Sequence, residues 1–173
     1  MEVCQRPGPG EYATHYAKYV DLVPEGELLA HLAIQARHLE ALLGGLDETR
    51  AAFRYAPGKW SVKELVNHVI DCERIFAYRL LRIARGDQTP LAGFEQDGYV
   101  AAGRADARTL EDLAAEFASV RGATLTLLAS LSAEDLARTG TASGHPVSAL
   151  ALAHIIAGHV THHGRILEER YIL

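Results

Sequence analysis

The residues best suited to chemistry lie near the C-terminus, where His159, His162 and His163 fall within five residues. The apolar residues around them recur at helical spacing, which predicts that this segment forms the last long helix. At about 100° per residue, His159 and His163 lie about 40° apart around that helix, within its apolar stripe. Two inward-facing imidazoles one turn apart can share a metal ion. A third ligand would then have to come from another helix.

His68 is the best candidate for the third ligand. It lies in a second predicted helix at angles close to those of Leu65 and Cys72, so it points at or beside the core. A lone histidine in such a place is more often a hydrogen-bonded core residue than a ligand. Three imidazoles buried together without a metal, however, would leave several ring nitrogens without partners. The combination of His68 with His159 and His163 therefore favours a metal site.

Two neighbouring residues have more than one interpretation. His162 lies about 60° from His159 on the other side, and it could replace His163 as a ligand or lie just outside the ligands. Cys72, one turn after His68, could be a fourth, soft ligand, although a buried cysteine is more often a small core residue.

Charged residues near His68 could support the site. Glu64 and Asp71 lie one turn either side of it and could orient its ring, although solvated helix charges are an equally good interpretation. Arg79 shares the face of His68 and could bind a carboxylate of a substrate or pair with an acid in the protein. The other histidines are weaker candidates, and His154 lies about 140° from His159 around the last helix.

Four amphipathic segments must position these residues. The expected helices cover about residues 24–43, 61–84, 109–130 and 148–171. The second has the clearest start, because Ser61-Val62-Lys63-Glu64 forms a capping box. We expect an irregular arm over residues 1–10, either a short helix or an extended segment over residues 11–20, and no pair of strands.

These elements predict a single all-α domain of 173 residues, folded as a four-helix bundle. The second and third helices are separated by roughly twenty residues without sustained periodicity, which is long for a compact domain. Such a connection can cross the length of the bundle, so a simple up-down-up-down order is not required.

The composition argues against several classes of protein. Hydrophobic residues make up 49% and charged residues 23%, as in ordinary globular proteins, and the net charge of -5 argues against nucleic-acid binding. No apolar run approaches the ~20 residues of a membrane span, and the N-terminal residues do not resemble a signal peptide. We therefore expect Cys4 and Cys72 to be free thiols, and the protein to be cytoplasmic.

The chain resembles the DinB-like superfamily of small, damage-inducible bacterial metalloenzymes. The resemblance rests on the block from Tyr55 to Glu64 that leads to His68, on residues 71–79, on the loop 89–99, and on Gly158-His159-x-x-His162-His163. Its specific part is Lys-Trp-Ser…His followed by a late His-x-x-x-His. The chain departs from the family after the last histidine, with Gly-Arg-Ile where many members have Arg-Gly-Gln, and this change keeps the metal positions.

The resemblance implies an up-down-down-up bundle that holds zinc or nickel on His68, His159 and His163. Similar enzymes are S-transferases that use bacillithiol, mycothiol or glutathione-type thiols, or a mycothiol-dependent isomerase, and several pair as homodimers. Three neutral imidazoles leave an open position where a thiol or water would lose its proton near neutral pH. We expect metal-dependent transfer of a low-molecular-weight thiol onto an electrophilic small molecule. The alternatives are hydrolysis by metal-activated water, or a bundle that binds a metal or small molecule without catalysis.

Overall fold

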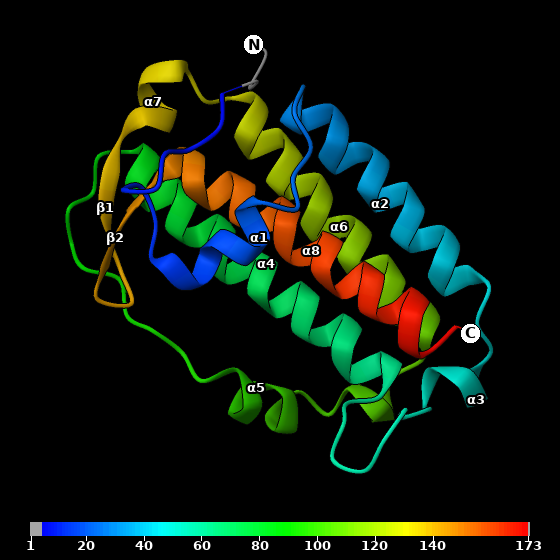
Figure 1. Ribbon diagram of the computed structural model, residues 1–173. Helices are drawn as coiled ribbons and strands as arrows, with labels where there is room; N and C mark the ends of the chain where they lie inside the picture. Colours follow the sequence, from blue (N-terminus) through cyan, green and yellow to red (C-terminus); the bar gives the residue numbers. More distant parts are fainter. Residues whose placement is uncertain (1–4, 173) are drawn as a thin grey trace.

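The computed structural model describes residues 5–172, and its main feature is a bundle of four long helices (Figure 1). These are α2 (Leu28–Gly44), α4 (Val62–Ala84), α6 (Leu110–Ala129) and α8 (Ala149–Arg170). Followed along the chain in Figure 1, α2 and α8 run in one direction, and α4 and α6 run in the other. The order is therefore up-down-down-up, which confirms the predicted fold class. Across the described residues, we find no helix with the length and hydrophobicity that a membrane span demands.

Local features of the chain set the start of two of these helices. At α4 the Ser61 hydroxyl accepts from the Glu64 backbone N–H at 3.1 Å, and the Glu64 carboxylate accepts from the Ser61 N–H at 2.8 Å. This is the predicted capping box. The first long helix begins at Leu28 rather than near Pro24, because Gly26 adopts a φ of 118°, which lies outside the helical region.

Short elements occupy the connections. In the described part of the chain they are the 3₁₀ turn Thr14–Tyr16, α1 (Ala17–Val20), α3 (Glu48–Ala51), α5 (Gln96–Gly103), the 3₁₀ turn Ala105–Ala107 and α7 (Ala133–Ala137). The segment 11–20 is thus helical in its second half. Residues 5–10 have no helix or strand, and Cys4 lies outside the described residues. The long connection, green in Figure 1, returns along the outside of α4 and contains α5.

The expectation that the chain has no strand pair was wrong for the Gly-rich link before α8. There, β1 (Thr139–Ala142) and β2 (His145–Ser148) form an antiparallel hairpin in which the first residue of β1 pairs with the last residue of β2. The two turn residues, Ser143 and Gly144, both have positive φ angles, 52° and 79°, as a type I′ turn requires. Strands of four residues with little apolar alternation give only a weak signal in a sequence.

A buried polar network joins the four long helices. Arg121 of α6 is 1% exposed, and it makes two hydrogen bonds of 2.7 Å to the Glu73 carboxylate of α4. Its guanidinium also donates to the Gln35 side-chain oxygen and the Leu32 carbonyl of α2. Gln35 in turn donates to the carbonyl of Ala157 on α8 at 2.8 Å. Because unpaired buried charges are costly, this pairing fixes α4 beside α6.

Candidate metal centre

The three predicted ligands come from two facing helices. His68 projects from α4, and His159 and His163 project from α8, where residues four apart face the same neighbour. The ring centroid of His68 lies 5.0 Å from that of His159 and 4.9 Å from that of His163. The ring centroids of His159 and His163, both on α8, lie 4.5 Å apart. All three side chains are buried. The structure therefore brings the predicted histidines together in one cluster.

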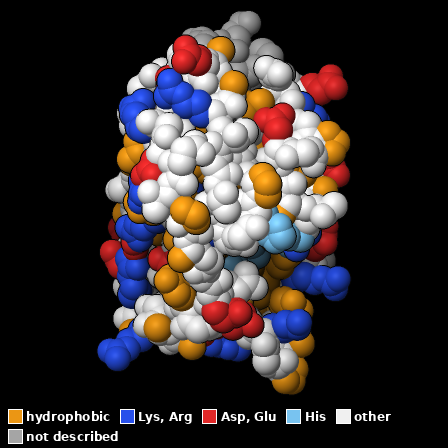
Figure 2. Space-filling model, turned by 90° about the vertical axis from the view of Figure 1, so that its left-hand side faces the viewer, with side chains coloured by type: hydrophobic (Ala, Val, Ile, Leu, Met, Phe, Trp, Pro, Cys, Tyr) orange, Lys and Arg blue, Asp and Glu red, His pale blue; other side chains and the backbone are white. Residues whose placement is uncertain are grey.

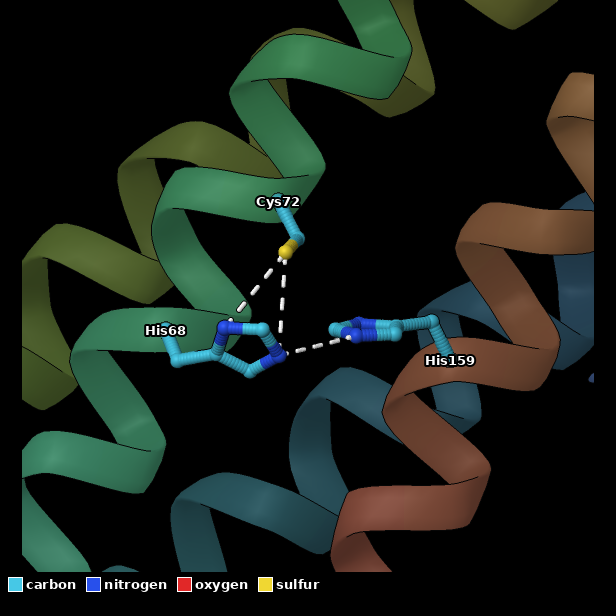
Figure 3. Close-up of side chains that lie close together, drawn as sticks. All are labelled: His68, Cys72 and His159. Carbon is cyan, nitrogen blue, oxygen red and sulfur yellow. Dashed lines mark hydrogen bonds between the residues drawn. The ribbon is translucent and has the colours of Figure 1, made fainter. Parts of the chain in front are cut away.

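The donor atoms that converge most closely belong to His68, Cys72 and His159 (Figure 3). The Nε2 atom of His68 lies 3.2 Å from Nε2 of His159. The Sγ atom of Cys72 lies 3.6 Å from Nδ1 and 3.7 Å from Nε2 of His68. One donor atom from each residue lies within 4.8 Å of the other two, in a group that could hold a metal ion.

The ring of His163 packs against those of His68 and His159, and one of its ring nitrogens lacks a hydrogen-bond partner. Its Nδ1 atom is buried and has no hydrogen bond among the described residues. Such a nitrogen costs free energy unless something binds it. A metal ion is a suitable partner, and imidazole and thiolate donors suit zinc and nickel better than they suit magnesium or calcium. The residues present therefore fit a divalent transition metal.

Burial keeps the imidazoles in their neutral form. Desolvation lowers the pKa of His68 to about 4. Desolvation, together with the neighbouring imidazoles, holds the pKa of His159 and of His163 well below the usual range. Burial also raises the pKa of the Cys72 thiol to about 12. At neutral pH the histidines thus present the unprotonated nitrogens that bind metals, whereas Cys72 must lose a proton before it can bind as a thiolate.

Two aromatic side chains, which the sequence analysis did not place in the site, cover the cluster. Trp60 packs on His68 with ring centroids 4.8 Å apart, and Tyr19 of α1 packs on His159 at 5.2 Å. Tyr19 reaches this position because α1 crosses α8 at Gly158, where a Cβ atom would lie 1.9 Å from the Tyr19 carbonyl oxygen. A glycine at a helix crossing is recognisable only when the partner segment is known.

His162 and Arg79 border the cluster. The half-buried His162 ring lies 5.0 Å from that of His163. Arg79 is buried, and its Nη2 atom donates to the Ala92 carbonyl at 2.7 Å and to the Ser143 hydroxyl at 3.1 Å. Arg79 thus ties the long connection and the hairpin turn to α4, and in the described structure it forms no ion pair with an acid.

Glu64 and Asp71 are engaged with groups other than the cluster. The Glu64 carboxylate accepts from the Ser61 backbone and from Arg54 at 2.9 Å. Asp71 accepts from the Asn67 side chain at 2.9 Å, and burial raises the pKa of its carboxyl group. These contacts favour the interpretation of both residues as helix charges over a role in orienting His68.

Two cavities open onto the cluster. The first, of about 300 Å³, is lined by Tyr55, Gly58, Lys59, Trp60, Leu65, Asp97, His163, Ile166 and Tyr171. The second, of about 370 Å³, is lined by His15, Tyr16, Lys18, Tyr19, Cys72, Phe76, Phe94, Glu95, Gln96, Ser143 and His159. They have no lining residue in common. Histidine side chains reach the surface at a hollow on the face shown in Figure 2.

Asp97 is a candidate that the sequence analysis missed. It lies in the first turn of α5 and lines the same cavity as His163. Its negative charge acts on His68 against the effect of burial. The segment around it has no periodicity, so only the path of the long connection reveals its position.

The fold and the site define a helical bundle with a buried histidine–cysteine cluster that could hold a metal ion. Comparison with known families agrees with this class. The family model of the DinB superfamily matches residues 27–167, and the chain belongs to that superfamily. No curated protein matches the chain.

Solved structures share the fold. YfiT from Bacillus subtilis, described as "a probable metal-dependent hydrolase with an unusual four-helix bundle topology", has a TM-score of 0.75 and 14% identity, over 95% of this chain and 90% of that chain. The mycothiol-dependent maleylpyruvate isomerase has a TM-score of 0.67 and 16% identity, over 80% of this chain and 58% of that chain. At these identities the comparisons establish a shared fold.

Proposed function

We propose that the protein is a metal-dependent transferase that moves a low-molecular-weight thiol onto an electrophilic small molecule. His68, His159 and His163 would hold the divalent ion, zinc or nickel, and the cluster of three buried, neutral imidazoles carries the proposal. When bound, such an ion supplies Lewis acidity at an open coordination position, which lowers the pKa of a thiol or water there.

Two separate cavities beside one cluster support a reaction between two substrates. Each cavity combines aromatic walls with a lysine and a carboxylate, which are Lys59 and Asp97 in the first cavity and Lys18 and Glu95 in the second. Aromatic walls suit a planar or apolar electrophile, and the charged groups suit a polar thiol, so either cavity could take either reactant. Both reactants could then reach the same ion from different cavities.

The protein's own side chains have defined roles in this proposal. Trp60 and Tyr19 pack on the ligand rings, hold their orientation and exclude water from them. The Asp97 carboxylate lines the cavity of His163 and could accept a proton from a reactant bound in that cavity. By analogy with the superfamily, we also propose that the protein is cytoplasmic and forms a homodimer. Sedimentation analysis of the purified protein would test the dimer.

Hydrolysis by an activated water at the same site is the second candidate function. The fold is shared with a protein described as a probable metal-dependent hydrolase, and Asp97 could equally accept a proton from water. A third candidate is a bundle that binds a metal or a small molecule without catalysis.

Metal analysis of the purified protein tests the site. One divalent ion per chain is expected in the wild type and in His162→Ala, because His162 lies beside the cluster. The ion should be lost from His68→Ala, His159→Ala and His163→Ala. A folded wild-type protein that neither carries a metal nor takes up zinc or nickel would overturn the metal site.

Turnover assays separate the candidate functions. Metal-loaded protein is incubated with a haloarene or an epoxide, with and without a panel of low-molecular-weight thiols. A thiol-dependent conjugate supports the transferase. Thiol-independent cleavage of an ester or amide would replace it with the hydrolase, and ligand binding without turnover would favour the non-catalytic bundle.

A further inference from the structure

We propose that Cys72 is an additional ligand, so that imidazole nitrogens and one thiolate bind the metal together. The inference rests on the metal site proposed above and adds a residue to it. Cys72 follows His68 by four positions on α4, so both side chains project from the same face of that helix. In Figure 3 the sulfur lies beside the ring of His68, with dashed lines to both of its nitrogens, and the ring of His159 lies on the far side of His68 Nε2.

The separations between donor atoms are those of ligands that share one ion. Zinc binds nitrogen at ~2.0–2.1 Å and sulfur at ~2.3 Å, so tetrahedral angles place two nitrogens ~3.3 Å apart and a nitrogen and a sulfur ~3.5 Å apart. The observed Nε2–Nε2 distance between His68 and His159 is 3.2 Å. The distance from Cys72 Sγ to His68 Nε2 is 3.7 Å. The sulfur also lies 3.6 Å from His68 Nδ1 and within 4.8 Å of the His159 donor atom, which is close enough to share one ion with the two histidines.

Charge balance supports a thiolate in this place. A divalent ion held by three neutral imidazoles would leave two positive charges among side chains that are almost fully buried. A thiolate at Cys72 cancels one of these charges inside the cluster. Asp97, the negative group that acts on His68, is exposed and is screened by solvent.

Cys72 belongs to the hydrophobic core and also borders a cavity. Cys72 lines the second cavity beside His159, so its sulfur faces the cluster and the space in which a substrate would lie. A fourth protein ligand fills the tetrahedral positions of zinc, so a substrate would bind there by expanding the ion to five-coordinate geometry. A thiolate would select zinc, cobalt or cadmium over manganese and magnesium.

Cobalt spectroscopy tests the assignment independently of activity. The chain has two cysteines, so Cys72 becomes the only thiol in a Cys4→Ser background. Cobalt(II) bound to this protein should show a near-ultraviolet sulfur-to-cobalt charge-transfer band beside the visible ligand-field bands. In Cys4→Ser/Cys72→Ala the charge-transfer band should be lost and the ligand-field bands retained.

Proton release on metal binding gives a second measure. Zinc binding to Cys4→Ser should release one proton more than binding to the double variant, because the thiol must ionise to coordinate. If Cys4→Ser/Cys72→Ala does not fold, Cys4→Ser/Cys72→Ser replaces it. The presence or absence of the charge-transfer band in Cys4→Ser still decides whether Cys72 binds the metal. Cobalt binding without a charge-transfer band in Cys4→Ser would overturn the role of Cys72 and leave the histidine site intact. Absence of any cobalt or zinc binding to folded Cys4→Ser would overturn both proposals.

Discussion

Replacement of Gly158 by alanine should destabilise the protein, because α1 crosses α8 at this glycine. A Cβ atom there would lie 1.9 Å from the carbonyl oxygen of Tyr19 and 2.4 Å from its carbonyl carbon. Both are backbone atoms, so a side-chain rotation cannot relieve the contact. Since real Cβ atoms essentially never show separations under 3.0 Å, α1 would have to retreat by at least the difference between 3.0 Å and 1.9 Å.

Gly164 provides a matched control in the same helix. A Cβ atom at Gly164 meets nothing within 4 Å. Both alanine variants gain about 0.5–1 kcal/mol from the better helix propensity of alanine. Only Gly158→Ala carries the cost of overpacking, which is about 1–3 kcal/mol. The free energy of unfolding should therefore be lower for Gly158→Ala than for Gly164→Ala by about 1–3 kcal/mol.

Urea unfolding of the two metal-free variants, followed by far-ultraviolet circular dichroism, measures this difference. Zinc titration gives a second readout, since displacement of Tyr19 disturbs its packing on His159. Gly158→Ala should bind zinc more weakly than the wild type, whereas Gly164→Ala should not. Equal stability of the two alanine variants would refute the steric argument.

Two further predictions concern buried polar groups outside the cluster. Arg121→Met should lower the free energy of unfolding by about 3–5 kcal/mol, because it leaves the Glu73 carboxylate buried without its cation. Arg121→Met/Glu73→Leu should recover part of this loss in urea unfolding, and a double variant no more stable than the single one would contradict the explanation. Burial lowers the pKa of His154 in the folded protein. As the pH falls below about 6.5, the unfolded chain therefore binds a proton more readily than the folded protein does, and the free energy of unfolding decreases. His154→Gln should flatten this loss in chelator-treated protein, and a slope of stability against pH that is unchanged from the wild type would contradict the explanation.

The long helices could be predicted because their signals are local. The capping box at Ser61 and the apolar periodicity after it coincide, and α4 begins where they place it. The inward direction of His159 and His163 follows from the same kind of evidence, since angles around a helix depend only on spacing. The start of α2 was misplaced because the positive φ of Gly26 is a property of the backbone that composition does not reveal.

Interactions between distant segments could not be predicted in this way. Arg121 and Glu73 resemble ordinary charged helix residues until α4 and α6 are placed side by side with the same direction. Asp97 and Tyr19 belong to short elements whose paths depend on the packing of the bundle. The convergence of the Cys72 sulfur with two histidines likewise requires the distance between α4 and α8.

The long connection between α4 and α6 separates two properties of the site. Because these helices run in the same direction, the chain must return along the bundle, and on this path residues 94–97 supply walls to both cavities. The clustered donors, by contrast, all belong to α4 and α8. Substitutions within residues 94–97 can therefore change which molecules enter while the donor atoms stay in place. Under the proposed function, selectivity for substrates would therefore depend on residues 94–97 and affinity for the metal on α4 and α8, so that either could be engineered without the other.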